Sequence, residues 1–215
     1  MLPAILLLAS IGTTSAIPQE TRTITANPAS PTDEPSYTRS DDFQAAMLTT
    51  HNRFRSQHSA PDLEWNDTLA DSSASHLDSV ATPSRCEFAH SGGPYGENLA
   101  LGYADAAAGV VAWGDERRGY DFGSGEFDDR TGHFTQMVWR DTSDVGCGRK
   151  LCGGGDDGGA RWFLVCQYWP RGNIVGSFTE MVQRPREGVD MGNAAGAVGP
   201  GGWWVGLSVV AGLLL

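Results

Sequence analysis

Hydrophobic positions recur every three or four residues in several stretches between residues 41 and 182, the spacing of one face of a helix. One stripe starts after Asp41, another after Asn66, and an alanine-rich one after Asp105. The first comprises Phe43, Met47, His51, Phe54 and His58, the second Leu69, Ser73, Leu77 and Val80, and the third includes Val110, Val111 and Trp113. The pattern predicts three helices, with Asn66 as N-cap of the second because its side chain accepts bonds from free N–H groups.

The last third of this region has the pattern of strands instead. Residues 134–139 alternate between apolar and polar side chains, and residues 161–168 are rich in aromatic and β-branched types. Residues 141–146 and 153–159 are expected to be turns. Helices followed by strands favour an α+β fold, in which helices pack on a mainly antiparallel sheet.

Both ends differ in composition from this region. An apolar run at residues 2–11 precedes Thr14-Ser15-Ala16, which predicts a signal peptide over residues 1–16; a short buried helix is the alternative. Residues 17–40 are rich in Ser, Thr and Pro and carry few large apolar side chains, so we expect a disordered stalk. Residues 183–193 are interpreted as a second stalk, which leaves a folded domain at residues 41–182.

The C-terminal residues 203–215 form an uncharged apolar tail. A helix of that length is too short to cross a hydrocarbon core of about 30 Å. The small residues 193–195 and a Gly/Pro spacer at 196–202 precede the tail. This arrangement is typical of a GPI-anchor signal and predicts attachment at Asn193 with removal of residues 194–215. A merely hydrophobic secreted terminus is the alternative.

The 215-residue chain is acidic, with 15 Lys and Arg against 26 Asp and Glu and a net charge of −11. Such a chain repels phosphate backbones, so we expect no nucleic-acid partner. Asn66-Asp67-Thr68 is an N-glycosylation sequon in a chain expected to be secreted.

The cysteine count is even, which in a secreted chain predicts two disulfides in one of three connectivities. The four are Cys86, Cys147, Cys152 and Cys166. A zinc cluster on cysteine is the competing interpretation, but the spacing lacks paired C-x2-C knuckles.

Several separated strings resemble one family. They are His51-Asn52-x-x-Arg55, Cys86-Glu-Phe-Ala-His90-Ser-Gly-Gly-Pro-Tyr-Gly-Glu97-Asn-Leu-Ala, Trp113-Gly-Asp-Glu116, Gly132-His133-Phe-Thr-Gln-Met-Val-Trp139 and Cys166-Gln-Tyr-Trp-Pro-Arg-Gly-Asn173. Their order resembles the CAP superfamily of cysteine-rich secretory, antigen 5 and pathogenesis-related class-one proteins. The likeness covers residues 43–181, and the stalk and the Gly-Gly-Pro-Tyr-Gly-Glu-Asn-Leu-Ala string are most similar to the fungal branch with its sterol-exporting yeast proteins.

The resemblance implies a three-layer α-β-α sandwich in which His90, Glu97, Glu116 and His133 converge on one cavity. Two imidazoles and two carboxylates suit Zn²⁺ or another divalent cation, or acid–base chemistry on a metal-bound water. A hydrogen-bonded polar network without metal is the alternative.

The resemblance also suggests the disulfides Cys86–Cys147 and Cys152–Cys166. The loop at residues 119–132 matches the sterol-binding loop of the related yeast proteins, and its aromatic residues are Tyr120, Phe122 and Phe127. Ordinary packing of these rings to anchor a long loop is the competing interpretation.

Three functions compete. The first is a secreted sterol or small-lipid binder, located outside the cell, in the wall or on a GPI anchor. The second is a metal-dependent hydrolase or protease, and the third is a structural or host-interaction module. The first is favoured over the second, because no nucleophile-elbow Ser, no His-Glu-x-x-His and no thiol outside the expected disulfides are present.

Overall fold

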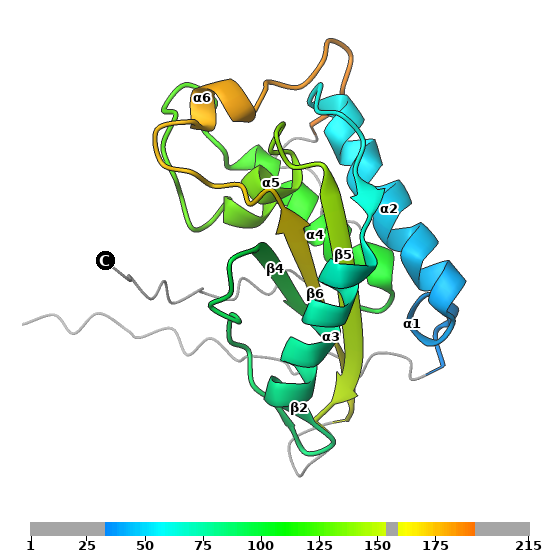
Figure 1. Ribbon diagram of the computed structural model, residues 1–215. Helices are drawn as coiled ribbons and strands as arrows, with labels where there is room; N and C mark the ends of the chain where they lie inside the picture. Colours follow the sequence, from blue (N-terminus) through cyan, green and yellow to red (C-terminus); the bar gives the residue numbers. More distant parts are fainter. Residues whose placement is uncertain (1–32, 154–158, 192–215) are drawn as a thin grey trace, which may run out of the picture.

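The computed structural model describes residues 33–153 and 159–191 (Figure 1). Its helices are α1 (Pro35–Thr38), α2 (Ser40–Gln57), α3 (Asp67–Val80), α4 (Ala106–Asp115), the 3-10 turn η1 (Glu116–Arg118), α5 (Gly132–Met137) and α6 (Phe178–Met181). Its strands are β1 (Glu64–Trp65), β2 (Ala81–Thr82), β3 (Arg85–Cys86), β4 (Gly96–Leu101), β5 (Asp144–Cys152) and β6 (Arg161–Trp169). None of the helices in these residues is long and apolar enough to cross a membrane.

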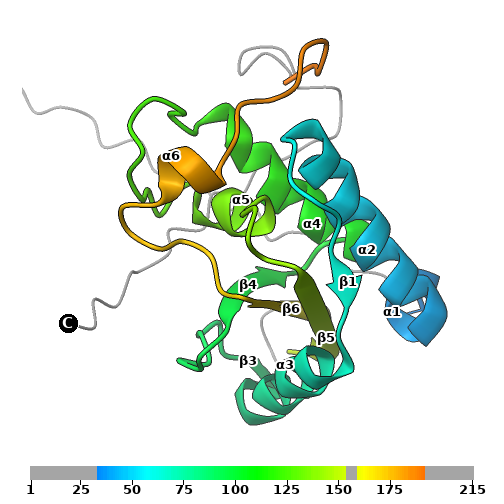
Figure 2. The same ribbon diagram turned by 45° about the horizontal axis from the view of Figure 1, so that its top comes forward.

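The main sheet has the order β1-β5-β6-β4, and β2 pairs with β3 in a small hairpin. β5–β6 and β6–β4 are antiparallel, whereas β1 runs parallel to β5. Figure 2 shows α3 on one face of the sheet and α2, α4 and α5 on the other. The expected three-layer α-β-α sandwich with a mainly antiparallel sheet is therefore confirmed.

The three helices predicted from apolar stripes are present as α2, α3 and α4. Asn66 caps α3 by accepting hydrogen bonds from the backbone N–H of Thr68 at 2.9 Å and of Leu69 at 3.4 Å. Asp105 caps α4 in the same way through Ala108 N–H at 2.8 Å. Asn66 is half-buried and also donates to Asp144 Oδ1 at 3.1 Å. Its glycosylation stays a prediction.

The strand predicted over residues 134–139 is wrong, because residues 132–137 form helix α5. Phe134 to Met137 are all buried, so the expected exposure of every second side chain does not occur. The carboxylate of Glu116 accepts hydrogen bonds from the first N–H groups of this helix, at His133 and Phe134, both at 3.1 Å. A carboxylate at a helix N-terminus stabilises it, and here the carboxylate comes from a distant element.

Strand boundaries also differ from expectation. The second predicted strand is β6, but β5 begins at Asp144, inside the segment expected to be a turn. The edge strand β4 was not predicted from the sequence. Only its middle residues are buried, so burial does not alternate along the strand.

The expected disulfide pairing is wrong, although all four cysteines are bonded. The bonds are Cys86–Cys152 and Cys147–Cys166. The register of β5 on β6 places Cys147 directly opposite Cys166, with a Cα–Cα distance of 4.1 Å. Cys152 lies opposite Arg161 instead, five residues along β6 from Cys166, which is too far for a bridge. The β2–β3 hairpin brings Cys86 to Cys152, because Gly153 N–H donates to the Thr82 carbonyl at 3.3 Å.

The folded domain begins earlier and ends later than the expected residues 41–182. Tyr37 of α1 is only 2% exposed and stacks on Trp162 with ring centroids 4.8 Å apart. Residues 183–191 run from α6 to the end of α2 (Figure 1), where Arg186 N–H donates to the Gln57 carbonyl at 2.8 Å. The predicted signal peptide, most of the first stalk, Asn193 and the apolar tail lie outside the described residues.

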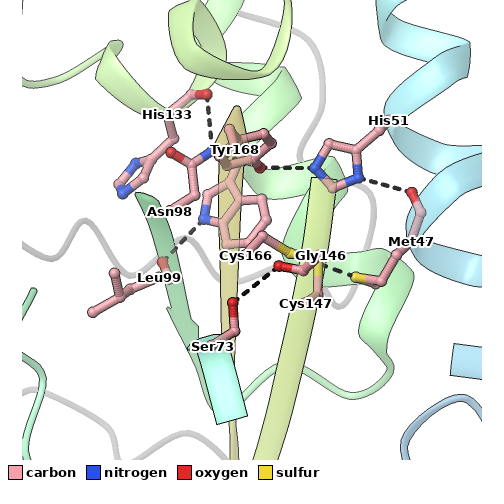
Figure 3. The surroundings of a disulfide bond; sticks show 11 residues. Met47, His51, Ser73, Asn98, Leu99, His133, Gly146, Cys147, Cys166 and Tyr168 are labelled. Atoms are coloured by element: carbon pink, nitrogen blue, oxygen red, sulfur yellow. Dashed lines mark hydrogen bonds between the residues drawn. A yellow bond between two sulfur atoms is a disulfide. The ribbon is translucent and has the colours of Figure 1, made fainter. Parts of the chain in front are cut away.

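A buried hydrogen-bond chain joins α2 to the sheet (Figure 3). The Nδ1–H of His51 donates to the Met47 carbonyl at 2.7 Å, so its Nε2 accepts from the Tyr168 hydroxyl at 2.8 Å. Asn98 donates to that hydroxyl at 3.2 Å and to the His133 carbonyl at 3.0 Å. The side chains of His51, Tyr168 and Asn98 thereby all have hydrogen-bond partners, and the backbone of His133 is tied to β4.

Burial lowers the pKa of His51 to about 4. An unfolded histidine has a pKa of about 6.5, so below that pH the unfolded state binds a proton that the native state does not. We expect the free energy of unfolding to fall by about 2 kcal/mol from pH 7 to pH 5 through this residue alone. Urea unfolding at both pH values checks this. A His51→Gln variant should be less stable at pH 7 but less pH-dependent; the same pH dependence in both proteins would contradict the assignment.

Candidate functional site

One histidine–carboxylate pair lies beside the edge strand β4. The Nδ1 of His90 is 2.9 Å from Glu97 Oε1. Glu97 also accepts hydrogen bonds from the Ser91 N–H at 2.8 Å and from Gln167 Nε2 at 2.9 Å. Burial raises the pKa of Glu97, but the hydrogen bonds from His90, Gln167 and Ser91 outweigh it and lower the pKa to about 2. Glu97 is therefore a fixed anion over the physiological pH range.

A second pair joins the start of α5 to η1. The Nδ1 of His133 is 2.7 Å from Glu116 Oε1, and the other carboxylate oxygen caps α5. The His133 ring stacks on Trp113, with centroids 6.1 Å apart. The Glu116 carboxylate therefore orients the ring and the helix that carries it.

Both pairs adjoin the strand β4. Glu97 bonds to Gln167, while its neighbour Asn98 bonds to the His133 backbone, and successive strand residues point to opposite faces. Consecutive residues of β4 therefore contact both pairs, Glu97 as a member of the first and Asn98 through the backbone of His133. Within residues 33–153 and 159–191, no group of three or more His, Cys, Asp or Glu side chains is placed to hold one metal ion.

The two pairs fit a cation only in part. In each histidine the carboxylate occupies Nδ1 and leaves Nε2 as the remaining donor atom, which is how a carboxylate orients a metal-binding imidazole. The convergence of all four side chains on one cavity stays a prediction. The Nε2 atoms of the two imidazoles are therefore the ligand atoms that the pairs leave available.

We call residues 119–131, between η1 and α5, the aromatic loop. Two of its three rings pack against the core, and the third is exposed. Tyr120 is 8% exposed, and Phe122 stacks on His58 with centroids 5.8 Å apart. Phe127 is 50% exposed and lies 6.1 Å from the Phe178 ring. Ordinary loop packing therefore accounts for Tyr120 and Phe122 in this conformation, and Phe127 is the ring available to a ligand.

Sequence reasoning missed the neighbours of this loop. Phe134 of α5 packs against both Tyr120 and Phe122, and Asn173, from the segment 170–177, donates to the carbonyl of Gly132, directly after the loop. Ile174 and Val175 in that segment are 39% and 86% exposed. In the sequence, the available signal for this segment was a pair of adjacent apolar residues outside any regular pattern.

Comparisons with known proteins agree with this architecture. A family model described as the cysteine-rich secretory protein family, CAP, matches residues 48–168. Protein PRY2 of Saccharomyces cerevisiae is 43% identical over 144 residues, which cover 66% of this chain and 41% of the relative. Secreted protein RBT4 of Candida albicans is 38% identical over 139 residues, covering 63% of this chain and 37% of the relative. The chain therefore matches less than half the length of these relatives.

A solved structure, titled as the crystal structure of NaASP2 with Zn²⁺, superposes with a TM-score of 0.50 at 22% identity. It covers 67% of this chain and 86% of that chain, and it supports the fold alone. Because the family model spans more than half of the residues and the expected sandwich is present, this protein belongs to the cysteine-rich secretory protein (CAP) family and resembles its fungal members.

Proposed function

We propose that this protein is an extracellular binder of a sterol or a related small lipid, which it contacts through loop 119–131. The observation that carries the proposal is the half-exposed ring of Phe127 on a loop whose other two rings are anchored in the core. Sterols are rigid and almost wholly apolar, so their sites need apolar walls and few polar contacts. The similarity to fungal relatives supports the same function.

The apolar surface around Phe127 extends to a second loop. A Cβ built on Gly132 would lie 3.1 Å from the Phe127 ring, so the ring lies over this glycine. The carbonyl of Gly132 accepts a hydrogen bond from Asn173 Nδ2 at 2.9 Å, and Ile174 and Val175 follow Asn173 in the chain. Exposed apolar side chains from two segments are thereby brought to one region, as a lipid-binding surface requires.

Replacing Phe127 alone tests the proposal without disturbing the core, which a Phe122 replacement would do. Burying the exposed half of this ring against a ligand contributes about 1 kcal/mol, so Phe127→Ala should weaken sterol binding about five- to tenfold. Radiolabelled-sterol binding to the purified protein measures this.

Phe88→Ala is the matched control, because Phe88 is 38% exposed but stacks on Phe163, away from the loop. It should bind sterol as the wild type does. Thermal unfolding of both variants checks that they are folded. Unchanged binding in Phe127→Ala would reject the loop as the sterol contact.

The variant with His90→Ala and His133→Ala should keep sterol binding, since a sterol offers no group that requires a metal.

We also propose that His90 and His133 bind Zn²⁺ or another divalent cation. The supporting observation is that a carboxylate holds Nδ1 of each ring and leaves Nε2 available.

Calorimetric titration with Zn²⁺ should show binding in the micromolar to millimolar range, reversed by a chelator. The variant with both His90→Ala and His133→Ala should lose it. Undiminished heat and stoichiometry in the double variant would place the cation elsewhere.

Secretion and membrane attachment complete the proposal. RBT4 is named a secreted protein, and the apolar N-terminal run favours the same route here. We expect a GPI anchor at Asn193, so phosphatidylinositol-specific phospholipase C should release the protein from cells. Mass spectrometry of the mature protein should find no peptide from residues 203–215, and its detection would refute the anchor.

A further inference from the structure

The outer edge of strand β5 is covered by another strand only at its start. β1 pairs with β5 at Asp144 and Val145 and then ends, because Asn66 caps α3 and the chain turns into that helix. On its other side, β5 pairs with β6 along its whole length. In the part of the chain that the structure describes, the main sheet therefore has an open edge along β5 beyond Val145.

The register shows which backbone groups point to this edge. The N–H of Asn66 donates to the Val145 carbonyl at 2.9 Å, so the backbone polar groups of Val145 point toward β1. Along a strand these groups alternate between the two edges. Those of Cys147 and Arg149 therefore point outward as well, whereas those of Gly148 point to β6. Among the described residues, no hydrogen bond satisfies these outward groups.

A groove of about 300 Å³ gives access to the unpaired groups. We name it the β5 groove: residues 147–149 are its floor, and the start of α2 and the first two turns of α3 are its walls. These two helices lie on opposite faces of the sheet (Figure 2). Cys147 is only 3% exposed, and backbone polar groups at such a position normally have partners. The floor of the groove therefore lacks partners that an added strand would supply.

The α3 wall of the groove is acidic. Asp67 and Asp71 lie on it one turn apart, and both are exposed. Asp67 accepts a hydrogen bond from Trp65 Nε1 at 3.0 Å, but neither carboxylate forms an ion pair within the described residues. Asp78, further along the same helix, differs in this respect, because Lys150 pairs with it at 2.6 Å. Two carboxylates in the groove thus remain free to bind a cationic group.

The α2 wall of the groove is aromatic. Phe43 and Trp65 meet edge to face, with ring centroids 6.3 Å apart. The Arg149 guanidinium lies 4.1 Å from the Phe43 ring centroid, and its Nε donates to the Tyr37 carbonyl at 2.8 Å. This cation is thereby held against the domain. Because side chains of a strand point alternately to the two faces, an added strand presents them in turn to the acidic and the aromatic wall.

We propose that the β5 groove binds an extended peptide segment of a partner protein by strand addition. The segment carries basic side chains that face Asp67 and Asp71, alternating with apolar side chains that face the aromatic wall. Its backbone bonds to the outward groups of Cys147 and Arg149, which is the general mode of recognition at an open sheet edge. A second copy of this chain is a poorer occupant, because both molecules would carry the net charge of −11.

This surface is separate from the proposed lipid site. No residue of the aromatic loop lines the β5 groove. The inference therefore does not depend on lipid binding, and either one can fail without the other.

Short synthetic peptides test strand addition. The probes are the capped hexapeptide Lys-Val-Lys-Val-Lys-Val and its counterpart with Glu in place of Lys. The basic peptide should bind about tenfold more tightly, because the aspartates attract its side chains and repel those of the acidic peptide. Equal binding of the two peptides, or no binding of the basic one, would overturn the proposal.

N-methylated forms of the basic peptide test its backbone. A strand donates to a given neighbour from every second residue. N-methylation of one alternate set of residues should therefore abolish binding, whereas N-methylation of the other set should not. The same result for both methylated peptides would exclude strand addition.

Amide hydrogen exchange on the wild-type protein locates the binding. The N–H groups of Cys147 and Arg149 should exchange faster than that of Gly148, which bonds to β6 and is the internal control. At a basic-peptide concentration ten times the dissociation constant, both should slow by about tenfold. Binding without this protection would place the peptide elsewhere and overturn the inference.

The same measurement without peptide identifies other occupants. Protection of both amides that grows with protein concentration would show that a second copy fills the groove. Protection that does not depend on concentration would show that residues of the same chain outside the described part cover it. Either result would overturn the proposal of a partner peptide.

Two matched aspartate variants of α3 test the charge contact. Asp71→Asn removes a carboxylate of the groove, and Asp78→Asn removes one outside it on the same helix. The first should weaken binding of the basic peptide about two- to fivefold, and the second should leave it unchanged. Both side chains are exposed, so both variants should fold, which thermal unfolding checks. Equal weakening in the two variants would reveal a general effect of net charge and overturn the contact.

Discussion

The buried guanidinium of Arg55 is the interaction on which the helical layer depends. Its side chain is 0% exposed and donates to four backbone carbonyls: Pro61 at 2.5 Å, Met137 at 2.8 Å, Trp139 at 2.9 Å and Thr142 at 2.7 Å. Burial lowers its pKa to about 10, which still leaves it protonated at neutral pH. A buried cation is costly unless hydrogen-bonded, so these carbonyls must stay where the guanidinium meets them. Arg55 thereby joins α2 to the end of α5 and to the turn that leads into β5.

The short helix α5 is held from both ends. Arg55 binds carbonyls at its C-terminal end, and the Glu116 carboxylate caps its N-terminal end. A six-residue helix is too short to be stable by itself, so these two charged groups and its packing maintain it. Since α5 carries His133, the position of the second histidine pair depends on Arg55 at the far end of the helix as well as on Glu116.

The contacts that hold η1 and α5 together also fix the two ends of the aromatic loop. Loop 119–131 starts after η1 and ends at α5, and the hydrogen bond from His133 to Glu116 joins these two elements. The ends of the loop are therefore fixed, while residues 121–126 make no backbone hydrogen bond to the core within the part of the chain that the structure describes. A cation on the histidines and a lipid at the loop would adjoin the same helix and still contact different side chains.

Local patterns in the sequence determined the parts of the fold that local interactions stabilise. The apolar stripes predicted α2, α3 and α4, and Asn66 was recognised as a cap because the N–H groups that it binds lie two and three residues away. The run at residues 161–168 predicted β6, and the separated motifs indicated the family and hence the sandwich.

The tertiary structure decided what depends on distant partners. Local sequence does not predict helix α5, because its capping carboxylate, Glu116, lies 17 residues before His133. The predicted disulfide pairing is wrong because pairing depends on the register of β5 on β6, which the positions of four cysteines in the sequence do not specify. The three loop rings look equivalent in sequence, and only packing against His58 and Phe134 separates buried Tyr120 and half-buried Phe122 from exposed Phe127.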